Sequence, residues 1–344
     1  MLKLHYFLVT IKSYLTIHFS SPAKLNLFRR LTLFLKGFFG ESSILYDFKN
    51  NNPKDYLSDY DRLKTRFING DKNVVLHDKE LFAFVFGSYL DIPKNLGYVW
   101  HGKLHLYGEE QNTVENLLNR IYGTSGVIIK PQTGGGGFFI NHLRANEDGI
   151  FLNNQRIDMP GLKDFIAKLK AFVITEYVEQ ADYAKAIFPG STNTIRLVTV
   201  IDPKTNKPFI PIAAHKFGTS KTMPADNFFQ GGLSASIDLE TGILGKAALF
   251  PGKARLEWHS HHPETGAPIE GVKVPNWKEI RDRMLYVASV FSSIKYIGWD
   301  IASTNDGFKV IEGNGFIGPH SIQVHRGLLR DPRLREFYKH YKVI

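Results

Sequence analysis

The feature that most constrains the fold of this chain is a run of residues near its C-terminus, 297–314, in which two apolar segments flank a short polar turn. The turn is the sequence Asn-Asp-Gly at residues 305–307. Apolar segments on either side of an Asp-Gly pair are typical of a β-hairpin. With a three-residue loop, Thr304 pairs with Phe308, and this register fixes the partner of every residue in both strands.

The same register places two carboxylates face to face. Asp300 lies opposite Glu312, with Cβ atoms about 5 Å apart on one face, and two like charges so placed repel unless a cation lies between them. Asn314 faces the same side as Glu312 because side chains alternate along a strand. Carboxylate and amide oxygens are the hard ligands that Mg²⁺ takes in proteins. We therefore expect a metal site at Asp300, Glu312 and Asn314, the alternative being a solvated strand face.

A second segment predicts phosphate binding. An apolar strand ends at Lys130, and four glycines follow it, Gly134, Gly135, Gly136 and Gly137. Glycine N–H groups can wrap phosphate oxygens, and the lysine supplies a positive charge to the same anion. Because two glycines suffice for a tight turn, we favour a phosphate loop over a simple hairpin. No GxxxxGK[ST] motif and no complete GxGxxG motif occurs, so a P-loop NTPase is excluded.

Helical and strand patterns are mixed along the chain from Val74 onward, which predicts an α+β or α/β fold in two lobes. We expect a helical N-terminal region over residues 1–74, one lobe over 75–180, and a second lobe with a C-terminal helix over 181–344. The predicted strands are 127–130, 172–178, 195–201, 211–215, 297–301 and 309–312, and the predicted helices are 55–66, 79–90, 110–121, 162–169 and 277–291.

Charge and composition limit the classes of function that the chain can have. The chain has 43 Lys and Arg against 33 Asp and Glu, a net charge of +10, which indicates an anionic partner. It has no cysteine, so thiolate catalysis, disulfides and cysteine zinc sites are excluded. Residues 1–40 contain six basic side chains and no acid, on segments with helical apolar periodicity. Two interpretations stay open: helices packed on the main body, or an anchor on anionic membrane lipid.

Taken together, these motifs resemble the ATP-grasp superfamily. A phosphate lysine with a glycine loop is followed some 170 residues later by an Asp…Glu-x-Asn hairpin. The segments Asn193-Thr-Ile-Arg196, Gly231 to Gly242, His262-Pro-Glu-Thr-Gly266 and Gly298-Trp-Asp-Ile are similar to the sugar-transfer-associated ATP-grasp proteins that accompany surface-polysaccharide genes. The resemblance covers about residues 75–330. It implies an α+β ATP-grasp fold in which two lobes hold the nucleotide between them.

The resemblance also implies roles for individual residues, with ATP and Mg²⁺ as cofactors, two ions being expected and Mn²⁺ an alternative. Lys79 and Lys130 bind the phosphates, and Gly134 to Gly137 close over them. Glu176, Tyr177 and Val178 hold adenine, with Asp182 near the ribose. The metal ligands match Asp300, Glu312 and Asn314. Roles next to the transferred phosphoryl group or the substrate fall to Arg196, Lys216 and Asn227.

The reaction that the resemblance implies is ATP-dependent joining of a carboxylate to an amine through an acyl phosphate. The expected substrates are a uronic acid or amino sugar, carried as a nucleotide-linked sugar, and a small amino acid or amine for O-antigen or capsule synthesis. A sugar phosphotransferase and a non-catalytic nucleotide-binding scaffold are the alternatives. We expect no nucleic-acid partner, because no zinc-finger or RRM-type motif occurs. The expected location is cytoplasmic, with peripheral contact at the inner face of the membrane.

Two histidine-containing segments are left over. Trp258-His259-Ser-His261-His262 is expected to be a solvated loop rather than a zinc site, with His262 as a sugar contact being the alternative. Gln323, His325 and Arg326 either face the acceptor or cap a C-terminal helix.

Overall fold

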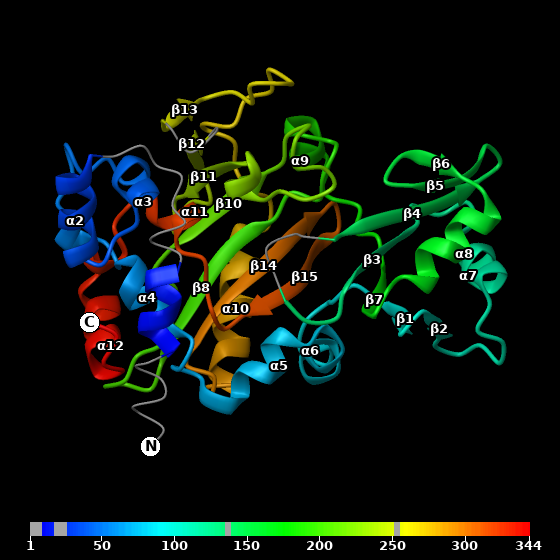
Figure 1. The fold of residues 1–344 in the computed structure, drawn as a ribbon, viewed down its shortest axis with the longest axis horizontal. Coiled ribbons are helices and arrows are strands. Elements are labelled where there is room, and N and C mark those ends of the chain that lie inside the picture. Colours follow the sequence, from blue (N-terminus) through cyan, green and yellow to red (C-terminus); the bar gives the residue numbers. More distant parts are fainter. Residues whose placement is uncertain (1–8, 17–25, 135–138, 251–254) are drawn as a thin grey trace.

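The computed structural model describes residues 9–16, 26–134, 139–250 and 255–344. Its strands form two separate antiparallel sheets, one of seven strands and one of eight. Figure 1 shows the smaller sheet at one end of the molecule, the larger sheet in the middle, and helices α2 (Leu27–Leu35) and α3 (Gly40–Leu45) at the other end. The mixed α+β architecture expected from the sequence is therefore present.

The first sheet has the order β2-β1-β7-β3-β4-β5-β6. Helices α7 (Val114–Ile121) and α8 (Met159–Ala167) pack on it through a core that includes Leu117, Ile129 and Leu162, each fully buried. Asp158 caps α8, since its Oδ1 accepts from the Gly161 N–H at 2.9 Å. The strands are β1 (Asn95–Trp100), β2 (Lys103–Leu106), β3 (Val127–Pro131), β4 (Asn141–Asn146), β5 (Gly149–Leu152), β6 (Gln155–Ile157) and β7 (Ala171–Glu176).

The second sheet has the order β13-β12-β11-β10-β8-β14-β15, and β9 pairs with β8 outside this path. Strand β14 lies between β8 and β15 and is buried along its whole length. Helix α10 (Trp277–Val290) packs on this sheet in one hydrophobic cluster. Helix α12 (Pro332–His340) packs on the same sheet in a second, separate cluster. The strands are β8 (Ile195–Ile201), β9 (Pro208–Phe209), β10 (Ala213–Phe217), β11 (Leu233–Ile237), β12 (Leu244–Leu249), β13 (Glu257–His259), β14 (Tyr296–Thr304) and β15 (Gly307–Asn314).

The N-terminal region is helical within the described residues and packs on the larger sheet's lobe. The side chain of Gln323 bonds both the N–H and the C=O of Leu57, at 2.6 and 3.1 Å. Gly313 of β15 lies against Leu76 and Phe82, so a side chain there would clash with both. The helices are α2 (Leu27–Leu35), α3 (Gly40–Leu45), α4 (Asp59–Thr65), α5 (Asn73–His77) and α6 (Lys79–Phe86), with short 3₁₀ turns at Pro53–Asp55 and Gly70–Lys72. Part of this region is thus built into the protein core.

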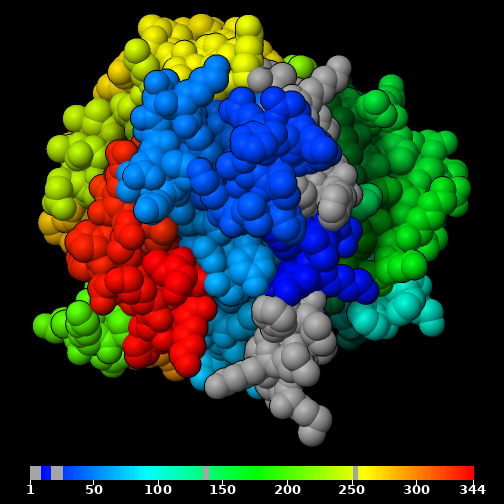
Figure 2. Space-filling model, turned by 60° about the vertical axis from the view of Figure 1, so that its left-hand side comes forward, coloured from blue at the N-terminus to red at the C-terminus, as the bar shows by residue number. Residues whose placement is uncertain are grey.

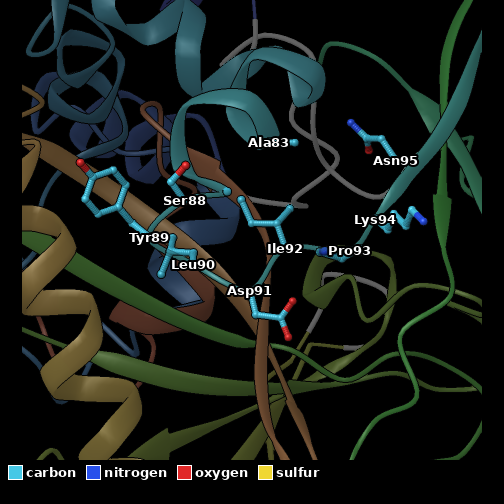
Figure 3. A pocket seen from close by; sticks show the side chains of 10 residues that line it. Ala83, Ser88, Tyr89, Leu90, Asp91, Ile92, Pro93, Lys94 and Asn95 are labelled. Atoms are coloured by element: carbon cyan, nitrogen blue, oxygen red, sulfur yellow. The ribbon is translucent and has the colours of Figure 1, made fainter. Parts of the chain in front are cut away.

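The connection from α6 to β1 carries the chain from one lobe to the other. Figure 3 shows its side chains around a small surface pocket, with Asp91 turned toward β15. The Asp91 carboxylate accepts from Lys309 Nζ at 2.9 Å, and the Asp91 carbonyl accepts from the Val310 N–H at 2.8 Å. Lys309 Nζ also lies 3.0 Å from Glu176 of β7. One lysine of the larger sheet therefore ties the connection to the smaller sheet.

Candidate active site

A cavity of about 840 Å³ is lined by residues of both sheets and of the N-terminal helices. β3 and β7 contribute from the smaller sheet, and β8, β10, β14 and β15 contribute from the larger. Helices α4 and α6 add Arg62 and Lys79. Of the sequence-predicted site residues, the structure brings these to the cavity: Lys79, Lys130, Gly134, Glu176, Val178, Arg196, Lys216, Asn227, Asp300, Glu312 and Asn314.

The predicted hairpin is present, and Asp300 does pair with Glu312. The predicted three-residue turn is wrong, because Thr304 pairs with Gly307 rather than with Phe308. A register shift between Asp300 and Ile301 compensates: Ile301 pairs with Val310, which leaves Ile311 as the extra residue of a bulge. Without that bulge, Glu312 would be one residue out of register and would face the other side of the sheet.

A compact ionic network lies in the middle of the larger sheet. Arg196 donates two hydrogen bonds to Asp300, from Nε to Oδ1 at 2.9 Å and from Nη2 to Oδ2 at 2.8 Å. Lys216 Nζ lies 3.3 Å from Asp300 and 3.2 Å from Asp226. This register is set by the sheet, since Arg196 pairs directly with Asp300 across β8 and β14.

The network keeps Asp300, Lys216 and Arg196 charged, although Asp300 and Lys216 are buried. Burial alone would raise the pKa of Asp300, but Arg196 and then Lys216 lower it well below its usual range. Burial would likewise lower the pKa of Lys216 and of Arg196, yet the adjacent carboxylates raise both. The sequence reasoning missed Asp226, whose Oδ2 accepts from the Thr194 N–H at 2.8 Å and from Thr194 Oγ1 at 2.6 Å. Its position directly before Asn227 was the one available signal.

The predicted metal ligands meet at one point. Asn314 Nδ2 lies 3.3 Å from Asp300 Oδ2 and 3.3 Å from Glu312 Oε1. Because Arg196 and Lys216 neutralise Asp300, the repulsion between the two carboxylates does not by itself require a metal ion, and that step of the sequence argument is wrong. The donor set still suits a hard divalent cation, since rotating the Asn314 amide turns its oxygen toward both carboxylates. The described residues contain no cluster of three or more acidic or histidine side chains arranged for a metal.

The end of the cavity that the sequence predicts to bind phosphate contains two lysines. Lys79 begins α6, and its Nζ donates to the Gly134 carbonyl at 3.0 Å and lies 3.9 Å from Glu312. Lys130 is only 6% exposed, and burial is the main reason that its pKa falls to about 8. The described residues place no carboxylate within 4.0 Å of Lys130 Nζ, so this cation faces the cavity without a direct ion-pair partner, and Glu312 and Asp300 act on its pKa only from farther away. Gly135, Gly136 and Gly137 lie outside the described residues.

The predicted adenine and ribose residues divide into two pairs. Glu176 and Val178 line the cavity. Tyr177 instead stacks on His142, with ring centroids 4.3 Å apart, and Asp182 is exposed at the start of α9 (Asp182–Ile187), where its N–H donates to Asn305 Oδ1 at 2.9 Å. Neither of these two lines the cavity, so their roles remain predictions from the resemblance.

A second polar group lies at the cavity where α4 meets the C-terminal segment, and the sequence alone did not predict it. His320 lines the cavity, and its Nε2 lies 3.0 Å from Oδ1 of Asp59, which is 3% exposed. The other Asp59 oxygen accepts from the Phe39 N–H and from Ser42 Oγ, both at 2.7 Å. Arg62, one turn further along α4, lies with its Cζ 4.0 Å from the centre of the Phe316 ring. No local pattern could pair Asp59 with His320, because 261 residues separate them.

His262, His325 and Gln323 are hydrogen-bonded within the protein. His262 is buried and its ring bonds the Gly218 carbonyl at 2.9 Å, and His325 bonds Ser234 Oγ at 3.1 Å, with its pKa lowered by burial to about 3. Gln323 is fully buried and holds the backbone of Leu57. None of these residues lines the cavity. Among the described residues around His259, no group of three or more acidic or histidine side chains is arranged for a metal.

The chain is similar to a known protein family in sequence and to solved structures in fold. A family model described as sugar-transfer associated ATP-grasp matches residues 59–338. Solved structures that resemble the chain include N5-carboxyaminoimidazole ribonucleotide synthetase with ADP (9% identity, 72% of this chain and 46% of that chain, TM-score 0.39) and D-alanine–D-alanine ligase from Bacillus anthracis with ATP (9%, 71% and 57%, 0.35). L-amino acid ligase from Bacillus licheniformis is a third (9%, 76% and 43%, 0.36). The chain spans about half the length of these proteins. No curated protein sequence matches it.

Proposed function

Because the chain belongs to the sugar-transfer associated ATP-grasp family, we propose that it is an ATP-dependent ligase that joins a carboxylate to an amine through an acyl phosphate. Membership implies ATP and a divalent cation. One observation carries the proposal: a single cavity gathers cations for a triphosphate and oxygen ligands for a metal ion. These residues are Lys79, Lys130, Arg196 and Lys216 on the cationic side and Asp300, Glu312 and Asn314 on the other.

Glu312 and Asn314, with Asp300, are the residues that would hold the divalent cation. Asp300 is already engaged by Arg196 and Lys216, so Glu312 and Asn314 have the greater freedom to turn toward an ion. A bound Mg²⁺ neutralises negative charge on phosphate oxygens. Mg²⁺ is the ion we propose, with Mn²⁺ as a substitute of the same ligand preference.

The chain's own cations act on the phosphates of ATP. Lys79 and Lys130, which has no direct ion-pair partner among the described residues, attract the triphosphate into the cavity. Asp300 uses two of the five N–H donors of Arg196 and leaves the remainder for oxygens of the transferred phosphoryl group. The two hydrogen bonds to Asp300 fix the plane of the Arg196 guanidinium before substrate binds. Such preorganisation is what electrostatic catalysis requires. Lys216 is held in the same way between Asp226 and Asp300.

The reaction needs no nucleophile from the protein, because both attacking groups belong to the substrates. A carboxylate oxygen of the first substrate attacks the γ-phosphorus, the bond from that phosphorus to the β-phosphate oxygen breaks, and ADP leaves. The amine then attacks the acyl carbon, the carbon–oxygen bond to phosphate breaks, and inorganic phosphate leaves with formation of an amide. The amine must also lose a proton to a base.

We place the amine substrate beside His320 and Arg62. Asp59 holds the His320 ring through Nε2, which leaves Nδ1 to accept the proton that the attacking amine loses. The ring is also fixed by Tyr46, stacked at 6.1 Å, and by the edge of Phe229 at 4.6 Å. Arg62 supplies a positive charge in the same cavity for a carboxylate or phosphate of that substrate.

A nucleotide-linked uronic acid or amino sugar and a small amino acid are the substrates that we propose, for surface-polysaccharide synthesis in the cytoplasm. The test is a screen for ADP release with nucleotide-linked sugars paired with amino acids, followed by mass spectrometry of the products. A ligase releases ADP and phosphate together and yields an amide. ADP with a phosphorylated sugar and no free phosphate would instead identify a phosphotransferase. If the protein binds nucleotide but releases ADP with no pair of substrates, it would be a non-catalytic nucleotide-binding scaffold.

A further inference from the structure

Helix α2 has apolar side chains on the side that faces away from the protein. Leu33 is buried at 6% exposure and belongs to a core cluster with Phe38 and Phe250. Four other apolar residues of the same helix are exposed: Leu27 (83%), Phe28 (82%), Leu31 (54%) and Leu35 (77%). Figure 2 shows the N-terminal helices, in blue, forming one broad face of the molecule beside the C-terminal helix. Residues 27, 31 and 35 recur at four-residue steps and so share one side of the helix.

The turn after α2 fixes that orientation. Gly37 has φ +80°, and a Cβ there would lie 2.8 Å from Ser58 Oγ, so only glycine fits. Its carbonyl accepts from the Tyr60 N–H at 2.9 Å, and the Phe39 N–H donates to the buried Asp59 carboxylate at 2.7 Å. Because these bonds attach the end of α2 to α4, the exposed apolar side chains cannot turn inward without breaking them.

Charge identifies what would cover this surface. Arg29 and Lys36 are exposed on and just after α2, and residues 1–40 contain six basic side chains and no acid. A symmetric dimer through this surface would bring two copies of this basic, acid-free segment together. An anionic lipid surface accepts both features, since the leucines and the phenylalanine enter the acyl boundary while the cations meet lipid phosphates. Among the described residues, no helix has the length and hydropathy to span a bilayer.

We propose that the outward side of α2, formed by Leu27, Phe28, Leu31 and Leu35, docks on an anionic bilayer surface and lies in its headgroup region. The proposal is independent of the ligase activity. It follows that the body of the protein, and with it the cavity to which α4 contributes, is held next to the membrane.

The test is co-sedimentation of the full chain with vesicles of phosphatidylcholine alone and of phosphatidylcholine mixed with phosphatidylglycerol. Wild type is expected to bind the mixed vesicles and to dissociate as salt rises. In Phe28→Gln/Leu31→Gln, two apolar side chains at about 1.5 kcal/mol each are lost, so partitioning should fall roughly a hundredfold. In Arg29→Gln/Lys36→Gln, the loss of two charges at about 1 kcal/mol each should weaken binding to the mixed vesicles roughly thirtyfold.

The chain offers a matched control on α6, which Figure 1 places well apart from α2. Leu81 and Phe84 are 42% and 86% exposed with the same three-residue spacing, so Leu81→Gln/Phe84→Gln should bind vesicles like wild type. Equal binding of wild type to neutral and anionic vesicles, or none to either, would overturn the proposal. So would equal loss in the α6 variant. A wild-type dimer that Phe28→Gln/Leu31→Gln converts to a monomer, without vesicle binding, would make the surface a contact between two copies.

Discussion

The ion pair between Arg196 and Asp300 gives a prediction that separates charge compensation from simple loss of a contact. Asp300 is 5% exposed, and its two oxygens accept from Arg196 at 2.9 and 2.8 Å. Removing one partner of a buried pair typically costs 3–5 kcal/mol because the other charge is left uncompensated. Lys216, 3.3 Å from Asp300, still compensates in part, so we expect Arg196→Ala to lower the free energy of unfolding by about 3 kcal/mol.

In Arg196→Ala, neutralising the Asp300 carboxylate, which has lost its arginine partner, should restore part of the free energy of unfolding. The double variant Arg196→Ala/Asp300→Asn is therefore expected to be more stable than Arg196→Ala alone, although it has lost one more native side chain. Urea denaturation followed by tryptophan fluorescence measures this, because the buried Trp277 and Trp299 both lie in this lobe. Turnover should fall by about 10²–10³ in Arg196→Ala, the usual loss for one well-placed stabiliser of transition-state charge.

The pH dependence has a definite sign. In wild type the pKa of Asp300 is lowered, so its stabilising effect is present above the unfolded value of about 3.9 and is lost as pH falls below it. Removal of Arg196 leaves burial opposed mainly by Lys216, so the pKa of Asp300 rises and its protonation then relieves the variant. The stability gap between wild type and Arg196→Ala should therefore be widest near neutral pH and narrow as pH falls toward about 4. A gap that stays constant over this range, or a double variant less stable than the single one, would refute the reasoning.

Three further predictions concern the cavity. Glu312→Gln should fold like wild type, yet a thermal-shift titration should show that Mg²⁺ no longer strengthens ATP binding, and an unchanged Mg²⁺ effect would remove Glu312 from the metal site. ATP affinity, measured by calorimetry, should fall as pH rises through about 8, because Lys130 then loses its charge before it binds phosphate. Lys130→Gln should bind weakly with no such dependence, and a persistent one would point to another group. Once substrates are known, His320→Gln should flatten the pH profile of amide formation while ADP formation with the carboxylate alone persists, whereas loss of both steps would indicate a structural role.

The sequence determined the parts of the site that depend on local pattern. The apolar strand before Lys130 and the hairpin acids were predictable, because strand periodicity fixes which side chains share a face. Even there the prediction rested on two errors that cancelled, since the actual turn is one residue shorter and a bulge at Ile311 restores the register of Glu312. Bulges depend on packing across the sheet, and here the neighbours of Gly313 in β15, Leu76 and Phe82, come from more than 230 residues earlier in the chain.

Tertiary structure alone decided how the charges are compensated. The sequence shows Asp300 and Glu312 as two repelling acids, whereas the folded sheet places Arg196 and Lys216 against Asp300 from strands about 100 and 80 residues away. Likewise, only folding brings Asp59 of a helix near the N-terminus to His320 near the C-terminus. Periodicity reports the environment of one element at a time, while the partner of a buried charge is chosen by whichever elements pack together, so the charges along each strand can be read from the sequence, but which of them meet cannot.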